Sequence, residues 1–411
     1  MDFVRGIDAV LPPPLLRRFD IVAFDPRGVG SSQPLACESG PALDAYLSLN
    51  PAPSTDAEIA TVAQADQQFA AGCTRQYGKE FLAHLDTMTT ARDMDFVRAA
   101  LGEATLTYVG YSYGTFLGAE YANLFPTRVR ALVLDGAVDP SLAGLQFDVQ
   151  QAIGFEKELG DYFNACVPGC PFSSGGNPRG AFMTLMQQVT AHPLQVGSRQ
   201  LTLALFLNGV AYGLYRPDLW PSLSKALQAA ARGDGSQLLS MSDALTDRSD
   251  NGTYDALTSV LPAVNCVDST YPTNLADYKA EATRVAQQAP IFGASLVWGS
   301  LVCAYWPVPP VIQPGPLHAA GAPPILVIGT TADPATPYQW AQALASQLEK
   351  GVLLTHVGDG HTSLGTGSGC VDGAVTSYLI TLAPPAKDSV CGNGNGPPSP
   401  PANGGTVGYV P

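Results

Sequence analysis

Five residues, Gly110-Tyr-Ser-Tyr-Gly114, constrain the fold of this chain more than any other stretch. They follow a short apolar run at 106–109 and precede a helical pattern at 115–125, which Pro126 ends. A serine between two glycines at a strand-to-helix turn is the pattern of a nucleophile elbow, in which the glycines allow a tight turn and the serine hydroxyl is exposed. A glycine-rich turn that happens to contain a serine would show the same five letters, so the rest of the chain has to decide.

Apolar runs and amphipathic patterns alternate at both ends of the chain. We predict strands over 19–24, 106–109, 129–134, 324–328 and 352–357, and helices over 55–77, 90–101, 115–125, 338–350 and 372–382. The apolar runs are continuous, which is typical of strands buried on both faces. Strands that alternate with helices form a parallel sheet with helices on either side. The sequence therefore predicts an α/β fold with a mostly parallel sheet.

The middle of the chain, residues 141–313, has a different pattern. Helical segments dominate it, over 145–166, 181–191, 201–215, 221–232 and 238–245. We interpret it as a helical cap inserted between two parts of one core, residues 1–140 and 314–391. Residues 392–411 are mostly Gly, Asn, Pro and Ser and have little to bury, so we expect a disordered tail.

Two further residues lie where predicted strands end. Asp333 follows the strand at 324–328, and His361 follows the strand at 352–357. Active sites of parallel α/β sheets lie at the carboxyl ends of the strands, and the chain order Ser112, Asp333, His361 is that of the α/β-hydrolases. Alone, His361 would be an ordinary loop histidine and Asp333 a helix cap. Together with the elbow they predict a catalytic triad.

Each member of the predicted triad has a chemical task. The hydroxyl of Ser112 is a weak nucleophile at neutral pH, so a base has to take its proton. His361 can do this because the pKa of histidine lies near neutrality, and Asp333 would fix the imidazole tautomer and stabilise the imidazolium. The backbone N–H of Tyr113, directly after the nucleophile, is the expected oxyanion donor.

Eight cysteines fall in neighbouring couples: Cys37 and Cys73, Cys166 and Cys170, Cys266 and Cys303, Cys370 and Cys391. An even count indicates disulfides and an oxidising compartment, although eight cysteines allow about 105 pairings. We predict that neighbours pair, so that each bridge closes a local loop. A zinc site is disfavoured because no C-x-x-C motif is present. Buried reduced thiols are the remaining alternative.

Charge and composition exclude several partners. The formal net charge of −14 would repel nucleic-acid phosphates and anionic membranes. No apolar run reaches the roughly 18 residues of a membrane span. Gly28 and Gly30 follow the first predicted strand, but Gln33 replaces the third glycine of a dinucleotide fingerprint. We expect no nucleic-acid partner, no membrane span, no metal and no cofactor.

Four motifs give the chain a specific family resemblance. They are Phe-Asp-Pro-Arg-Gly-Val-Gly-Ser-Ser (24–32), Gly-Tyr-Ser-Tyr-Gly-Thr (110–115), Val-Leu-Asp-Gly-Ala-Val-Asp-Pro (133–140) and Gly-Thr-Thr-Ala-Asp-Pro-Ala-Thr-Pro (329–337). These motifs, residues 263–268 and the segment with Cys370 and Cys391 resemble the tripeptidyl-aminopeptidase-like branch of the prolyl aminopeptidase family. The resemblance implies an α/β-hydrolase fold and a secreted serine exopeptidase that releases short peptides, often tripeptides, from free N-termini.

The resemblance also implies roles for single residues. It carries nucleophile, acid and base onto Ser112, Asp333 and His361, and it implies that acidic groups of the cap meet the substrate ammonium. Asp268 is our candidate, against the alternative of a solvated or capping aspartate. Two other functions stay open: a small-ester or amide hydrolase, because a triad does not fix the leaving group, and a hydrolase-fold protein that binds without turnover.

The N-terminus departs from the family pattern. The family has a signal peptide, its first strands and a Gly-Gly-Pro-Gly-type oxyanion loop before the segment that begins here at Met1. No apolar signal segment and no such loop precede Phe19. We therefore expect a truncated form of an exported enzyme, which lacks a second oxyanion donor and a strand next to the one predicted at 19–24.

Overall fold

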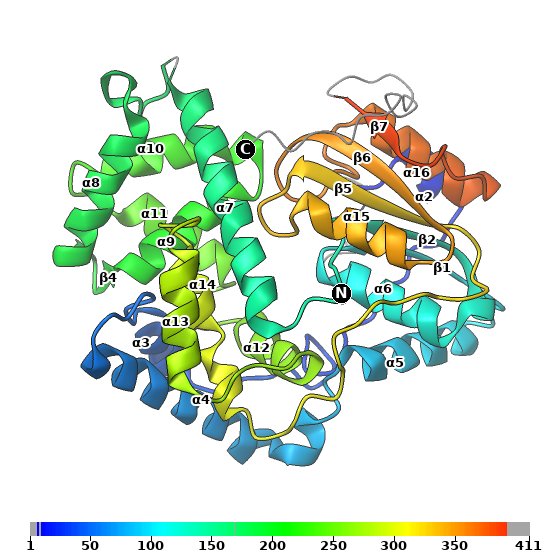
Figure 1. Cartoon of the computed structure of the whole chain (residues 1–411), viewed down its shortest axis with the longest axis horizontal. Coiled ribbons are helices and arrows are strands. Elements are labelled where there is room, and N and C mark those ends of the chain that lie inside the picture. Colours follow the sequence, from blue (N-terminus) through cyan, green and yellow to red (C-terminus); the bar gives the residue numbers. More distant parts are fainter. Residues whose placement is uncertain (1–5, 8–9, 168, 393–411) are drawn as a thin grey trace. The chain divides into compact units, whose positions relative to one another are not determined.

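The computed structural model describes residues 6–7, 10–167 and 169–392. They divide into two compact units: the first draws on 1–24, 87–141 and 315–411, and the second on 25–86 and 142–314. Figure 1 shows the path of the chain through both. Of the predicted disordered tail, residues 393–411 lie outside the described residues.

The first unit is built on a parallel sheet of five strands (Figure 1). Their order is β1 (Leu106–Tyr111), β2 (Val129–Asp135), β5 (Ile325–Ala332), β6 (Gly351–Asp359) and β7 (Ser389–Cys391). Every neighbouring pair runs parallel. The side chains of β2 alternate between the faces: Ala131 and Val133 pack into one apolar cluster, and Leu132 and Leu134 into another. The predicted α/β fold with a parallel sheet is confirmed.

Helices cover both faces of this sheet. Buried residues of α2 (Pro13–Leu16) and α16 (Gly369–Thr381) pack with Ala131 and Val133 on one face. Those of α5 (Thr87–Ala100), α6 (Tyr113–Leu124) and α15 (Tyr338–Gln347) pack with Leu132 and Leu134 on the other. A short turn of 3-10 helix, η2 (Pro126–Arg128), links α6 to β2. Since a buried Val or Leu contributes about 1.5–3 kcal/mol, the two clusters fix the sheet between its helices.

The strand predicted at 19–24 is wrong. These residues form no strand and no ladder with β1, and Val22 is 57% exposed. Phe19 and Ile21 pack against one apolar cluster of the sheet, and Phe24 against the other. The apolar side chains of the segment are thus partly buried, but burial alone does not make a strand, which also needs a neighbouring strand to accept its backbone hydrogen bonds.

The second unit is mainly helical. Its α-helices are α3 (Gly40–Leu47), α4 (Asp56–Leu82), α7 (Gly144–Cys166), α8 (Pro178–Ala191), α9 (Leu203–Leu214), α10 (Trp220–Ala230), α11 (Ser236–Leu245), α12 (Leu257–Asp268), α13 (Leu275–Val285) and α14 (Gly293–Gly299). Two short 3-10 turns lie between them, η3 (Ser174–Gly176) and η4 (Pro217–Leu219), and a third, η5 (Leu301–Tyr305), follows α14. A hairpin of β3 (Leu194–Val196) and β4 (Arg199–Leu201), which the helical pattern concealed, precedes α9.

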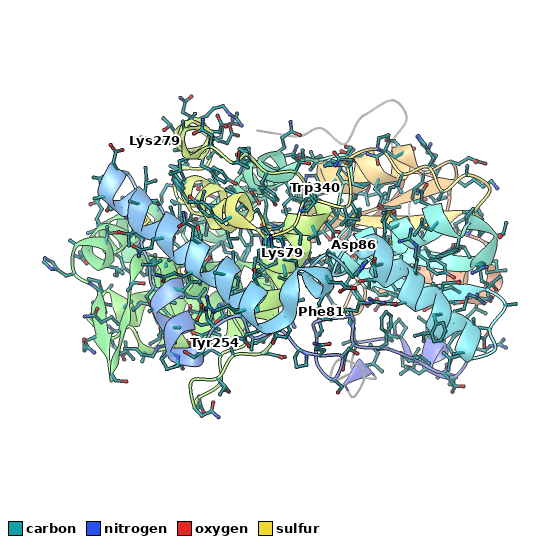
Figure 2. The ribbon with its side chains drawn as sticks, turned by 90° about the horizontal axis from the view of Figure 1, so that it is seen from below. Lys79, Phe81, Asp86, Tyr254, Lys279 and Trp340 are labelled. Atoms are coloured by element: carbon teal, nitrogen blue, oxygen red, sulfur yellow. A yellow bond between two sulfur atoms is a disulfide. The ribbon has the colours of Figure 1, made fainter. Side chains whose placement is uncertain are left out.

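Residues 25–86 belong to this second unit, whereas the sequence pattern placed them with the sheet. The long helix α4 explains the difference. A capping box between Thr55 and Glu58 starts it, and Phe69 on its buried side packs with Val260 and Val302 of the helical segments. Figure 2 shows α4 with Lys279 near its start, where Lys279 Nζ lies 3.2 Å from Asp56 Oδ1. The other unit boundaries, 141/142 and 314/315, fall within one residue of the predicted limits of the insertion.

All eight cysteines form the four neighbouring pairs expected from the sequence, Cys37–Cys73, Cys166–Cys170, Cys266–Cys303 and Cys370–Cys391. Three pairs lie in the second unit, and the fourth joins α16 to β7 in the first. Each bridge therefore links segments of one unit. None of the helices in the described ranges combines the length and the apolar composition required to span a bilayer.

Candidate active site

Ser112 lies between the end of β1 and the start of α6, in a strained backbone conformation. Its φ is 52° and its ψ is −124°, which few residues other than glycine adopt. Such a conformation costs about 1–3 kcal/mol and persists only where the surroundings enforce it. A Cβ added to Gly110 would meet the carbonyl oxygen of Gly114 and lie 2.7 Å from Tyr108 Cε1. The elbow therefore closes only with glycine at position 110.

Hydrogen bonds hold this turn on both sides. The Ser112 N–H donates to the Asp135 carbonyl oxygen at the end of β2, over 2.9 Å. The Thr115 hydroxyl donates to the Ser112 carbonyl oxygen over 2.6 Å and accepts from the Val138 N–H over 2.9 Å. The Tyr108 hydroxyl donates to the Gly114 carbonyl oxygen over 2.7 Å. The strained serine is thus fixed to two neighbouring strand ends.

His361 and Asp333 lie together, after β6 and β5. His361 Nδ1 is 2.9 Å from Asp333 Oδ1 and 3.0 Å from Oδ2. The carboxylate also accepts the N–H groups of Ala335 and Thr336 at 2.9 and 2.8 Å, and the Thr336 hydroxyl at 3.0 Å. The Asp333 side chain is fully buried. With this many donors, the buried carboxylate is held in a fixed orientation against the imidazole.

The pKa of His361 reflects this pair. Burial alone would lower the pKa of the imidazole, but the negative charge and hydrogen bond of Asp333, with a smaller effect from the charge of Asp135, raise it above its ordinary value. Because Nδ1 faces Asp333, Nε2 is the nitrogen left to exchange a proton with another group. The ring can therefore accept a proton at Nε2 and carry the resulting charge.

Gly136 connects the serine side of the site to the histidine side. It follows Asp135, which accepts the Ser112 N–H, and its own N–H donates to the Ile328 carbonyl oxygen at 3.2 Å. A Cβ on Gly136 would lie 3.2 Å from His361 Cε1, and its φ is 68°. The imidazole therefore packs directly on the backbone residue next to the one bonded to Ser112. Serine, histidine and aspartate all lie at the carboxyl edge of the sheet.

Asp135 is a buried carboxylate of this site that the sequence pattern did not single out. It is the last residue of β2 and is fully buried. Its Oδ2 accepts the N–H groups of Ser363 and Leu364 at 2.9 and 2.7 Å, just after His361. Burial, against these hydrogen bonds, raises the pKa of Asp135 to about 6. The available signal was an aspartate at the end of a mostly apolar strand, followed directly by Gly136.

Two further predicted residues occupy different surroundings. Tyr113 is the first residue of α6, so its N–H lies at the helix N-terminus, and its hydroxyl is 2.5 Å from Thr87 Oγ1. Asp268 is the last residue of α12 in the second unit and is 8% exposed. The structure thus places Ser112, Asp333 and His361 after the ends of β1, β5 and β6 of one sheet in the first unit, with the N–H of Tyr113 directly after the serine.

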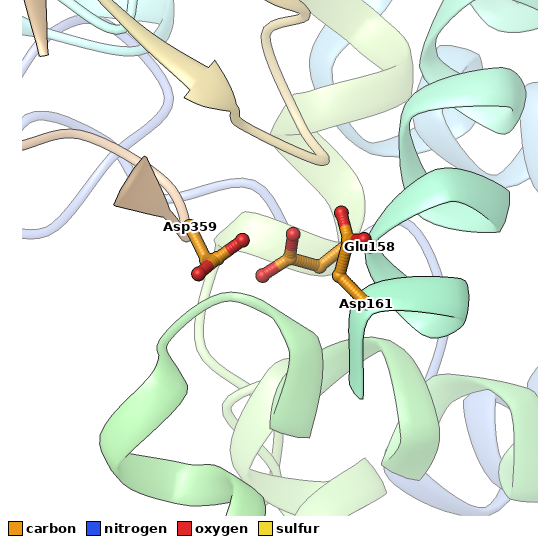
Figure 3. Close-up of side chains that lie close together, drawn as sticks. All are labelled: Glu158, Asp161 and Asp359. Carbon is orange, nitrogen blue, oxygen red and sulfur yellow. The ribbon is translucent and has the colours of Figure 1, made fainter. Parts of the chain in front are cut away.

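Three more acidic side chains are drawn in Figure 3. Glu158 and Asp161 lie one turn apart on α7 in the second unit, and Asp359 ends β6 in the first. Glu158 is buried, whereas Asp359 is exposed. Exposed carboxylates are common on protein surfaces, so the exposure of Asp359 by itself indicates no function.

Comparison with known proteins is consistent with this geometry. The family model described as "TAP-like protein" matches residues 289–391. Serine protease Hip1 of Mycobacterium tuberculosis is 37% identical over 403 residues, covering 94% of this chain and 77% of the relative. Carboxylesterase B of the same species is 38% identical, covering 92% and 74%. Tripeptidyl aminopeptidase of Streptomyces lividans is 31% identical, covering 91% and 71%.

Proposed function

The chain belongs to the tripeptidyl-aminopeptidase-like (TAP-like) family of α/β-hydrolases, and on this basis we propose that it is a serine exopeptidase that removes short peptides from free N-termini. The observation that carries the proposal is the pairing of His361 with a buried, multiply hydrogen-bonded Asp333 at the same sheet edge as the strained Ser112. Relatives named as a serine protease and a tripeptidyl aminopeptidase support a peptide substrate.

In the first half of the reaction, Ser112 Oγ attacks the carbonyl carbon of the scissile bond. The hydroxyl proton passes to His361 Nε2, and Asp333 stabilises the imidazolium through Nδ1. The N–H of Tyr113 donates to the oxyanion that forms on the carbonyl oxygen. As the C–N bond breaks, the imidazolium returns its proton to the leaving amine, and the peptide's N-terminal part remains as an ester on Ser112.

In the second half, a water molecule attacks this ester. His361 Nε2 takes one proton from the water while the oxygen bonds to the carbonyl carbon, and a second tetrahedral intermediate forms at the same oxyanion site. When the bond to Ser112 Oγ breaks, the proton passes from His361 to the serine. The product is a short peptide with a free carboxylate, and the enzyme regains its starting protonation state.

The substrate's free amino group needs a counter-charge, and Asp268 is our candidate for it. An ammonium group paired with a carboxylate forms a charge-assisted hydrogen bond, worth about 1.5–3 kcal/mol. We also propose that the protein acts outside the cytoplasm, since disulfides persist in oxidising compartments and all eight cysteines are paired.

A second candidate function is hydrolysis of small esters, which the relative named carboxylesterase B favours. Three chromogenic substrates separate the two functions: a tripeptide amide with a free amino end, the same amide with its amino end blocked, and a short acyl ester. A peptidase of the proposed type cleaves the free amide much faster than the blocked one. Fast ester cleavage with no amide cleavage would favour the esterase instead.

A further inference from the structure

The segment after His361 is held almost entirely by carboxylates. The N–H of Thr362 donates to Asp333 Oδ2 at 3.2 Å, and the next two N–H groups donate to Asp135 Oδ2. The N–H of Gly365 donates to Asp372 Oδ1 at 2.9 Å. Four successive N–H groups therefore point at three acidic side chains. The φ of Thr362 is 67°, which turns the backbone from the first carboxylate toward the second.

Asp135 also holds the nucleophile. Its carbonyl oxygen accepts the Ser112 N–H at 2.9 Å, while its side chain accepts the backbone of residues 363 and 364. β2 lies between β1, which leads to Ser112, and β5, which leads to Asp333. Asp135, on the central of these three strands, therefore hydrogen-bonds both the backbone of Ser112 and the backbone of the loop that follows His361. A side chain fully buried at this point has no freedom to relax.

We propose that Asp135 is a positioning residue of this enzyme: its carbonyl fixes the elbow, its carboxylate fixes the loop of the base, and together they set the distance between Ser112 and His361. The inference rests on the proposed function, because it assumes that these two residues react together. The ionisable groups that face Asp135 are His361, Asp333 and Tyr111. Its charge therefore also acts on the imidazole, in the same direction as that of Asp333.

Two substitutions of Asp135 distinguish its effect on the position of the loop after His361 from the effect of its negative charge on the imidazole. Asp135→Asn is isosteric: its Oδ1 can accept from the N–H groups of Ser363 and Leu364, and its Nδ2 can donate to the Ser363 hydroxyl, now 3.4 Å from the carboxylate. Asp135→Ala removes these bonds and leaves two buried N–H groups without an acceptor. Asp139→Asn is the matched control, because Asp139 lies four residues after Asp135 and is also buried, but it bonds Ser141 and Gln347 instead.

The experiment measures the rate of Ser112 labelling by a fluorophosphonate between pH 5 and 9, together with the melting temperature. We expect Asp135→Ala to slow labelling by ~10²-fold, as a displacement of about 1 Å does in other active sites. We expect Asp135→Asn to label within a few-fold of wild type near pH 8, with the acidic limb of its pH profile moved to lower pH. Asp139→Asn should match wild type in both respects.

The outcomes distinguish this inference from the proposed function. If wild type labels and Asp135→Ala labels equally fast while folded, Asp135 does not position the site and the inference fails. If Asp135→Ala does not fold, Asp135→Glu decides, because it keeps the charge but moves the acceptor by about one carbon–carbon bond: labelling at the wild-type rate in the folded variant overturns the inference, and labelling slowed by ~10-fold or more supports it. If wild type itself does not label, the proposed function fails first.

Discussion

The two sides of the site are held in different ways. Around Ser112 the backbone turns where neighbouring atoms leave no room for a side chain at Gly110, whereas the backbone after His361 donates its N–H groups to carboxylates. A Cβ at Gly110 would collide with the Gly114 carbonyl, and one at Gly118 would lie 2.6 Å from Leu134 Cδ2. These are steric limits, set by backbone atoms and by the side chains of Tyr108 and Leu134, and no carboxylate is among these neighbours. The elbow is therefore sensitive to added atoms.

The His361 loop depends on groups whose charge can change. Asp333 accepts from His361 and Thr362, and Asp135 accepts from the two residues that follow. Protonation of Asp135, or replacement of either carboxylate by an amide, removes negative charge from a buried group and weakens its bonds to N–H donors. The loop is therefore sensitive to lost charge and to pH. The two halves of one site should consequently fail under different perturbations.

The largest effect is expected from substitution of Ser112, whose hydroxyl is the proposed nucleophile and whose proton passes to His361. Ser112→Ala should lower turnover of a tripeptide amide by roughly 10⁶-fold, because no oxygen nucleophile remains for the base to activate. Fluorophosphonate labelling should disappear, while the melting temperature stays within a few degrees, because the backbone that fixes the turn is unchanged. A variant that labels as well as wild type would identify a different nucleophile.

Asp333→Asn tests the His361 side of the site, which depends on charge. An amide at this position cannot stabilise the imidazolium and favours the wrong tautomer, so turnover should fall by ~10⁴-fold. The comparison is with Asp388→Asn, which changes an exposed aspartate directly before β7. Steady-state kinetics of both variants measure the difference. Equal activity of Asp333→Asn and wild type would remove Asp333 from the proposed triad.

Gly110→Ala tests the Ser112 side of the site, which is limited by steric contacts. The added methyl group has to displace the Gly114 carbonyl, so we expect a loss of stability of about 1–3 kcal/mol and a loss of turnover of ~10²-fold. Gly373→Ala is the matched control: it lies on α16 with no atom within 4 Å of its added Cβ, and alanine stabilises a helix by ~1 kcal/mol relative to glycine. Chemical denaturation and kinetics report both quantities.

The serine half could be predicted from the sequence, and part of the histidine half could not. A five-residue motif between an apolar run and a helical pattern identifies Ser112 from local sequence, because the turn requires glycine at positions 110 and 114 and both can be read directly. Asp333 and His361 were predictable because each follows a recognisable strand. The role of Asp135 depends on residues 228 and 229 positions away, which no local pattern contains.

The same distinction explains the errors in the predicted fold. Residues 19–24 have the composition of a strand but lack a ladder, which only a neighbouring strand provides. Residues 56–82 were correctly expected to be largely helical, yet the unit to which α4 belongs depends on its packing with Val260 and Val302. Local pattern predicts which element forms, and contacts distant in sequence decide where it packs.

A pH titration sharpens the contrast between the two halves. Burial lowers the pKa of His361, but the charge and hydrogen bond of Asp333 together with the charge of Asp135 outweigh burial and raise it above the ordinary value near 6.5. The acidic limb of kcat/KM should therefore lie above pH 6.5, and in Asp333→Asn the imidazole should titrate at lower pH. With five histidines in the chain, NMR of the ring Cε1–H can follow His361 directly.

The same pair predicts a change in stability. Since folding raises the pKa of His361, the pair stabilises the fold fully below pH 6.5, and this contribution is lost as the pH rises through the folded-state pKa. The melting-temperature difference between wild type and Asp333→Asn should shrink over that interval. A difference independent of pH would show that the charge of His361 does not contribute to the pair.

The smallest expected effect concerns Asp268, a carboxylate proposed to contact substrate rather than backbone. Asp268→Asn should raise KM for tripeptide amides with a free amino end by ~10-fold, the equivalent of about 1.4 kcal/mol, because the ammonium loses a charge-assisted bond. It should leave KM for a short acyl ester unchanged, since that substrate carries no ammonium. Asp277→Asn, an exposed acid on α13, provides the control for a general loss of negative charge. Equal losses on amide and ester would instead assign a structural role to Asp268, as for the carboxylates that hold the His361 loop.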